Sequence, residues 1–236
     1  MKRRIAVRIV LASAVLAALI AQAVVFLRAK SASSELVRLV DRSDETTLRE
    51  CLAENPSLSN ARLPASGDTI LNYAVEQGRL PSVDALLNAG ADPNLHGFSK
   101  RTALHIAVQQ GNTNIVLRLL QAGADIESTG YRHDETPLHV ASSHGFAKMV
   151  VLLLDHGAHI DSRNMQKETP LMRAVQNGHI ETVRALLERG ANPRLLDQRN
   201  RSALDFALKS GNEQIVSLLR NAQTGNQQSA SSDESR

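Results

Sequence analysis

Five copies of one short motif, spaced at a nearly constant interval, constrain the fold of this chain more than any other feature. Each copy begins with Thr or Ser, has Leu two residues later and Ala five residues later, and is followed by Gly four residues after the Ala. The copies begin 33, 34, 33 and 33 residues apart, at Thr69, Thr102, Thr136, Thr169 and Ser202. A fixed period of this length indicates a repeat array, in which each unit stacks on its neighbours.

Each unit is predicted to contain two short helices. In the third copy, Thr136 fits an N-cap and Pro137 fits the first helical position, where its missing N–H costs nothing. Gly145 ends this first helix. Residues 146–155 carry apolar side chains at helical spacing, and Gly157 can adopt the positive φ that ends the second helix. Because neither helix can bury its apolar face alone, the units must be stabilised by stacking.

The repeated unit closely resembles the ankyrin repeat. The resemblance rests on the motif TPLHxA, the glycine after it, the Leu-Leu pair of the second helix and the Gly-Ala-Asp turn, and it covers residues 35–221. It implies an all-α fold, a solenoid of stacked helix-turn-helix units. It also implies that the histidine of TPLH is structural. We therefore expect His105 and His139 to be buried residues that tie neighbouring turns together.

The two ends of the array are expected to be atypical, because terminal repeats need a polar outer face for solubility. A degenerate first repeat spans residues 35–66 and lacks the TPLH motif. Repeats then start near residues 69, 102, 136 and 169, and a capping repeat starts at residue 202. Residues 222–236 are rich in Gln, Ser and Asn, so they are predicted to form a disordered tail.

A separate hydrophobic helix is predicted within residues 1–30. Residues 9–27 form an apolar run broken only by Ser13 and Gln22, and as a helix they would span roughly 28 Å, about one hydrocarbon core. One interpretation is a signal-anchor helix that stays in the membrane. The other is a signal peptide removed after Ala23, at the sequence Ala-Gln-Ala.

Both interpretations place the repeats outside the cytoplasm, because four basic residues precede the apolar run and positive charge is held on the cytoplasmic side. The retained helix gives a single-pass membrane protein with its repeats on the periplasmic or other extracytoplasmic side. The cleaved form would be periplasmic or secreted. The single cysteine, Cys51, cannot form an intrachain disulfide, so it does not decide the compartment.

The charge of the chain argues against a nucleic-acid partner. The net charge is +3, but residues 1–30 contribute six basic side chains and no acidic one. Of the chain's 27 basic and 24 acidic side chains, the remaining residues therefore hold 21 and 24, a net charge of −3. Tryptophan is absent and aromatic residues make up 3% of the chain, so no stacking platform for bases is expected.

A search for catalytic and metal-binding patterns finds little. The motifs HExxH, GxxxxGK[ST], GxSxG and CxxC are all absent. His156 and His159 stand three residues apart among carboxylates, but both occupy turn positions of the repeat, and a solvated turn is the better interpretation. We expect no catalytic residue, no cofactor and no metal, and therefore no enzyme activity.

The resemblance to ankyrin repeats also predicts where a partner binds. In that family, contacts come from the turn between repeats and from the adjoining end of the first helix. The residues at these positions are Phe98, Ser99, Arg101, Gln109, Gln110, Tyr131, Arg132, His133, Glu135, Ser143, His144, Met165, Gln166, Gln176, Asn177, Arg199 and Arg201.

Two details of these turns depart from the family pattern. Phe98, Tyr131 and Met165 fall in successive turns, where small or polar residues are usual, and would form an exposed apolar stripe. The turn glycine remains only at Gly67, and Lys100, Asp134, Lys167 and Asn200 replace it in later repeats, so the detailed turn geometry could differ.

The sequence as a whole predicts a non-enzymatic module for protein–protein interaction, tethered to a membrane through residues 9–27 and exported. Its partner is an unidentified protein, and the chain is expected to be a monomer. Two alternatives remain open: a regulatory or protective subunit of an enzyme partner, and an exported effector with a cleaved signal peptide.

Overall fold

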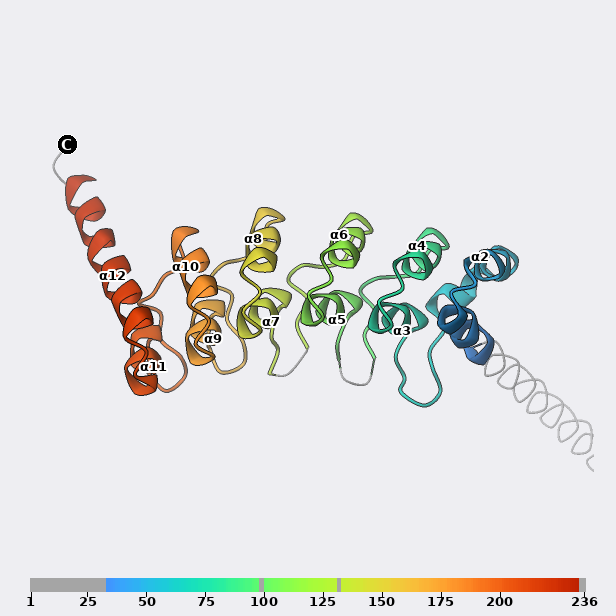
Figure 1. Cartoon of the computed structure of the whole chain (residues 1–236), viewed down its shortest axis with the longest axis horizontal. Helices are drawn as coiled ribbons and strands as arrows, with labels where there is room; N and C mark the ends of the chain where they lie inside the picture. The colour runs from blue at the N-terminus through green and yellow to red at the C-terminus, as the bar shows by residue number, and fades with distance from the viewer. Residues whose placement is uncertain (1–32, 98–99, 131–132, 234–236) are drawn as a thin grey trace, which may run out of the picture. The chain divides into compact units, whose positions relative to one another are not determined.

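The computed structural model describes residues 33–97, 100–130 and 133–233, with side chains up to residue 224 (Figure 1). The apolar run at residues 9–27 lies outside the described part, as do Phe98, Ser99, Tyr131 and Arg132. The described part is helical, which confirms the all-α prediction, and its one isolated β-bridge joins Arg62 and Thr69.

The chain divides into two compact units, residues 1–91 and 92–236. In the first unit, residues 33–42 are helical. The elements that follow are α2 (Glu45–Glu54), the 3-10 helix η1 (Pro56–Asn60), α3 (Ile70–Glu76) and α4 (Leu80–Asn88). Leu48 and Leu52 of α2 are buried, whereas Cys51 between them is half-buried. This unit therefore contains the degenerate first repeat and the first full helix pair.

The second unit contains four helix pairs. Their bounds are α5 (Ala103–Gln109) and α6 (Thr113–Gln121), α7 (Pro137–Ser143) and α8 (Ala147–Asp155), α9 (Pro170–Gln176) and α10 (Ile180–Glu188), and α11 (Ala203–Ser210) and α12 (Glu213–Asp233). Within this unit, α5, α7, α9 and α11 lie side by side in one layer, and α6, α8 and α10 form a second (Figure 1). Each first helix packs on the next, so the core runs from one pair to its neighbour.

The helix starts follow from their capping residues. Thr169 accepts a hydrogen bond from the backbone N–H of Met172 at 3.3 Å, and Ser202 accepts one from Asp205 at 3.3 Å. The core between the helices includes Leu138 of α7, Leu153 of α8 and Leu171 of α9, which are completely buried. Small Ala residues at the sixth motif position are also buried, which lets the helices approach closely.

The two TPLH histidines join each repeat to the next, and their predicted burial is confirmed. Both His105 and His139 have no exposed surface. The Nδ1 of His139 lies 2.9 Å from Thr136 Oγ1 and accepts from the Thr136 N–H at 3.3 Å, so its Nε2 carries the proton. That Nε2 donates to the backbone carbonyl of Glu168 at 3.0 Å, and His105 Nε2 donates to the carbonyl of Glu135 at 3.0 Å.

The position of the turn glycine keeps a left-handed φ although its residue differs from repeat to repeat. Gly67 has a φ of 64°. The residues that replace this glycine, Lys100, Asp134, Lys167 and Asn200, have φ values of 56°, 59°, 59° and 58°. Each replacement therefore keeps the left-handed φ of the glycine, but the loop before α7 has a different geometry, because His133 is left-handed as well, with a φ of 55°.

The glycine that ends α7 is required by its neighbour as well as by its φ of 76°. A Cβ atom at Gly145 would lie 2.6 Å from the Nδ1 of His179. The His179 ring occupies this space because its Nε2 hydrogen-bonds to the Ser143 carbonyl at 3.0 Å. Glycine at this position therefore lets the α9–α10 turn pack against the end of α7.

Helix α12 begins at Glu213 in the packed last repeat and is assigned as far as Asp233. It is started by packing of Ile215 and Leu219, and the turns after residue 221 contain no proline but include Gly225, which disfavours a helix. The disordered tail over residues 222–236 stays a prediction.

Candidate partner-binding surface

The predicted contact residues of the first helices lie at equivalent positions, at the ends of α5, α7 and α9. Gln109, Ser143 and Gln176 are the last residues of these helices and are half-buried. Gln110, His144 and Asn177 are their C-caps and are exposed. Because α5, α7 and α9 lie side by side, these six residues form one polar row, which we call the helix-end row.

The predicted contact residues of the turns lie on hairpin loops that are hydrogen-bonded to one another. The Met165 N–H donates to the His133 carbonyl at 2.8 Å, and the Gln198 N–H donates to the Gln166 carbonyl at 2.9 Å. The loops before α7, α9 and α11 are therefore held in register. His133 and Arg199 are exposed, Gln166 is half-buried, and Met165 is 63% exposed.

Glu135 corrects one prediction of an exposed contact, since its side chain is only 3% exposed. Its Oε1 lies 2.9 Å from the Nε of Arg173 in α9, and the Nη1 of Arg173 lies 3.6 Å from Oε2 of Glu168. One guanidinium thus faces carboxylates from two successive hairpin loops. Burying a carboxylate requires such a partner, so Glu135 supports the surface from beneath.

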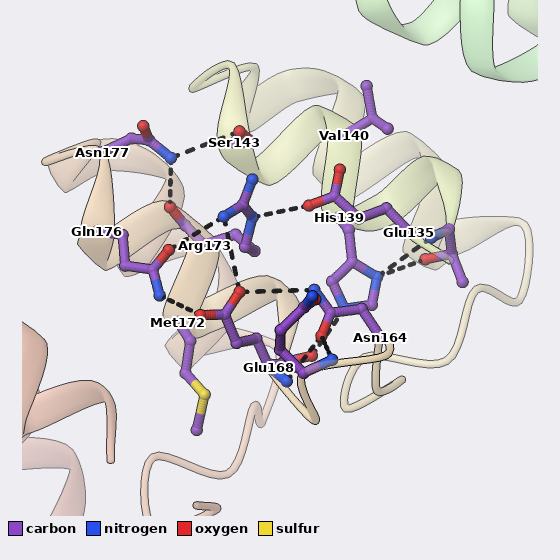
Figure 2. A network of polar contacts seen from close by, with 12 residues as sticks. Glu135, His139, Val140, Ser143, Asn164, Glu168, Met172, Arg173, Gln176 and Asn177 are labelled. Atoms are coloured by element: carbon purple, nitrogen blue, oxygen red, sulfur yellow. Dashed lines mark hydrogen bonds and ion pairs between the residues drawn. The ribbon is translucent and has the colours of Figure 1, made fainter. Parts of the chain in front are cut away.

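The cluster around Arg173 extends to a residue of the helix-end row. Figure 2 shows Glu135, Glu168 and Gln176 converging on Arg173. Gln176 donates from Nε2 to Glu168 Oε1 at 2.6 Å and accepts from Arg173 Nη1 at 3.1 Å. The side chain of Asn164 caps the hairpin by accepting from the N–H groups of Gln166 and Glu168. This Arg173 network therefore fixes both the loop and the end of α9.

Sequence reasoning did not find Arg173. It stands at the fifth motif position, which Val140 occupies in the preceding repeat and Ile106 in the one before that. The sequence did contain a signal for this network. A charged residue replaces an apolar one at this position, and Glu135 and Glu168 stand 33 residues apart in the adjoining turns.

The repeated helix pairs correspond to a known protein family. The sequence matches the family described as "Ankyrin repeats (3 copies)" over residues 72–164 and 161–229, which is more than half of the chain. The chain belongs to the ankyrin repeat family. A comparison with curated proteins found no match. Ankyrin repeats serve generally as scaffolds for protein–protein interaction, so protein partners are implied.

Several other residues of the predicted surface of this ankyrin array are held by neighbouring side chains. Arg101 Nη1 donates to Gln109 Oε1 at 3.3 Å, and the ring of His144 stacks on Phe146 with centroids 5.7 Å apart. Arg201 donates from Nη2 to Asp197 at 2.6 Å, and its guanidinium lies 4.4 Å from the centre of the Phe206 ring. The surface is therefore largely preorganised, which lowers the entropy lost on binding.

The carboxylate of Asp197 illustrates how the last hairpin is stabilised. Burial opposes its ionisation, but hydrogen bonds from Arg201 and from the backbone N–H groups of Arg199 and Arg201 outweigh burial and lower the pKa of Asp197 below its usual value. An ionised Asp197 accepts these bonds, so Arg199 is presented at the tip of a charged and well-ordered turn.

Four surface hollows of the described part, such as the one between α8 and α10, are lined by residues that are not among the predicted contacts. Within that part, no group of three or more His, Cys, Asp or Glu side chains could hold a metal ion. The described helices also include none that combines the length and the apolar character needed to cross a membrane.

Proposed function

We propose that this ankyrin array is a non-enzymatic interaction module whose protein partner binds across the helix-end row and the hairpin loops. The observation that carries the proposal is the Arg173 network, which holds Gln176 and two successive loops in place while Asn177 and Met165 remain exposed. Chemical crosslinking in the native cell, followed by purification through the C-terminus, would isolate the partner. Its affinity can then be measured for each variant below.

We propose in addition that Phe98, Tyr131 and Met165 contribute an apolar stripe to this surface. Interface energy is concentrated in a few large side chains, each worth roughly 2 kcal/mol. Substitution of all three by Ser should therefore weaken partner binding by several kcal/mol. Stability should change little, because exposed substitutions typically cost within about 0.5 kcal/mol each. Calorimetric titration and urea unfolding measure the two effects.

The control for this variant is Leu153→Ala, which removes a completely buried side chain of α8. It should cost about 2–5 kcal/mol of stability through the cavity it leaves, while partner affinity per folded molecule stays the same. Unchanged affinity in the triple Ser variant would rule out the stripe as the binding site.

We further propose that the array is exported and tethered to a membrane by residues 9–27, with the repeats outside the cytoplasm. The support is the apolar run and the four basic residues that precede it. A C-terminal fusion to alkaline phosphatase should be active, whereas a fusion to a fluorescent protein that folds only in the cytosol should be dark. The reverse pattern would contradict the topology.

The fate of the N-terminal segment is tested in the same cells. A retained anchor keeps the protein in the membrane pellet at high salt and at alkaline pH. A mature chain that begins at Val24 would instead show cleavage after Ala23 and would make the protein periplasmic or secreted.

A further inference from the structure

The exposed charges on the hairpin loops of the second unit are mostly positive. Lys100, Arg163, Lys167 and Arg199 are exposed. Arg163 donates to the backbone carbonyls of Lys167 and Leu196, so it lies across two loops. Among the residues that the structure describes, none of these four cations forms an ion pair with a carboxylate. We call these four residues the basic edge.

The acidic residues of the same loops are neutralised inside the protein. Glu135 and Glu168 are buried and face Arg173, and Asp197 is buried and bonded to Arg201. Asp134 is half-buried, and Asp125 and Asp161 lie nearer the start of their loops, where they are exposed and half-buried. At the tips of the loops before α9 and α11, a ligand would therefore meet the exposed cations Lys167 and Arg199.

The basic edge is rigid, but its cations do not recur at each loop, because the loop before α7 carries Asp134 at the position of Lys100 and Lys167. Lys100, Lys167 and the intervening Asp134 occupy equivalent turn positions with the same left-handed backbone, and the loops before α7, α9 and α11 are joined by hydrogen bonds. Packed helices lie about 8–10 Å apart, so equivalent side chains recur at about that distance. An extended polypeptide advances about 3.3 Å per residue. Every third residue of an extended segment would therefore meet a new loop.

We propose that the basic edge binds an extended acidic segment of the protein partner, with two carboxylates about three residues apart opposite the loops before α9 and α11 and a third about six residues away, opposite Lys100. The inference rests on the proposed function and names the chemistry of its ligand. A polypeptide fits better than a nucleic acid. Residues 31–236 carry a net charge of −3, so only a local acidic segment avoids repulsion by the rest of the array.

The test uses the full-length chain in mild detergent and a fluorescein-labelled peptide about 12 residues long, with three Glu residues spaced about six and then about three positions apart and Ser elsewhere. Fluorescence anisotropy at about 50 mM NaCl, where screening is weak, should show saturable binding. The variant Lys100→Gln, Lys167→Gln, Arg199→Gln should bind about tenfold more weakly, since each exposed ion pair contributes modestly. The wild-type affinity should fall as salt is raised.

A matched variant makes the same charge change on second helices, with Lys148, Arg184 and Arg220 each replaced by Gln. It should bind the peptide within about twofold of the wild type, because long-range charge effects are screened. The proposal is overturned if both triple variants lose affinity equally. It is also overturned if the wild type does not bind the peptide, or if a lysine version of the peptide or a single-stranded DNA oligonucleotide binds as tightly.

The same variants separate this inference from the proposed function. A crosslinked partner that binds the Lys100, Lys167, Arg199 variant with unchanged affinity would overturn the basic edge as its contact while leaving the interaction module intact. If the partner binds the basic-edge variant but not the apolar triple variant, its contact lies on the stripe instead. If both triple variants fail to bind the partner, the partner contacts both surfaces.

Discussion

Acidification from pH 7 to pH 5 is expected to lower the free energy of unfolding by about 4 kcal/mol, because His105 and His139 are buried as neutral side chains. Burial lowers the pKa of each histidine from 6.5 to about 4, against the smaller opposing effect of the carbonyl that each Nε2 meets. Nearby Arg101 and Arg173 lower the pKa of His105 and His139 further.

The sign follows from where the proton binds. Below pH 6.5 the unfolded chain takes up a proton at each histidine, whereas the folded chain does not until about pH 4. Stability is therefore complete above pH 6.5, falls through this window and levels off below it. Each histidine lowers the free energy of unfolding by about 2 kcal/mol at pH 5 and by about 3 kcal/mol at pH 4, relative to its value at high pH. The low-pKa carboxylates, such as Asp205, act only at more acidic pH.

Urea unfolding at pH 7, 6 and 5 measures this effect. The double variant His105→Gln, His139→Gln should be less stable at pH 7, because it loses the fitted hydrogen bonds to the next repeat, but its stability should change little between pH 7 and pH 5. Substitution of the exposed His133 and His156 by Gln is the control and should leave the slope intact. A double variant that keeps the full slope would show that other groups cause the acid sensitivity.

The second large effect is expected for Arg173→Met, which should cost about 3–5 kcal/mol of stability at neutral pH. The change removes the cation that lies 2.9 Å from the buried carboxylate of Glu135, and removing one partner of a buried pair is strongly destabilising. The control is Arg184→Met. Arg184 pairs with the exposed Glu181 at 3.7 Å, so its loss should cost within about 0.5 kcal/mol.

A double variant tests whether the uncompensated charge is the cause. Glu135→Gln combined with Arg173→Met removes both charges, and it should recover about half of the loss, because a neutral buried pair carries a smaller desolvation penalty. Urea midpoints of the two single variants and the double variant give the coupling energy. Equal losses for Arg173→Met and Arg184→Met would contradict a stabilising role for the network.

The features that could be predicted from the sequence are those set by local chemistry repeated along the chain. The Thr and Ser caps, the helix-ending glycines and the apolar positions recur in each unit, so each copy supports the interpretation of the others. The burial of His105 and His139 also followed, because the resemblance assigns them a structural role.

The parts that could not be predicted depend on contacts between repeats. Glu135 was placed on the surface because its turn position is usually exposed, but Arg173 from the next repeat draws it into the interior. The sequence alone does not show which rotamers bring these two residues and Glu168 together.

The common conformation of the hairpin tips has a consequence for how this surface can diversify. Lys, Asp and Asn stand at the same left-handed position with φ values between 56° and 59°. The backbone there is held by main-chain hydrogen bonds, such as the 2.8 Å bond from the N–H of the tip residue Lys167 to the Asn164 carbonyl, and these do not depend on the side chain at the tip. Each tip residue can therefore be exchanged without refolding its neighbours. Specificity for different ligands can in this way be acquired one loop at a time, on a scaffold that stays the same.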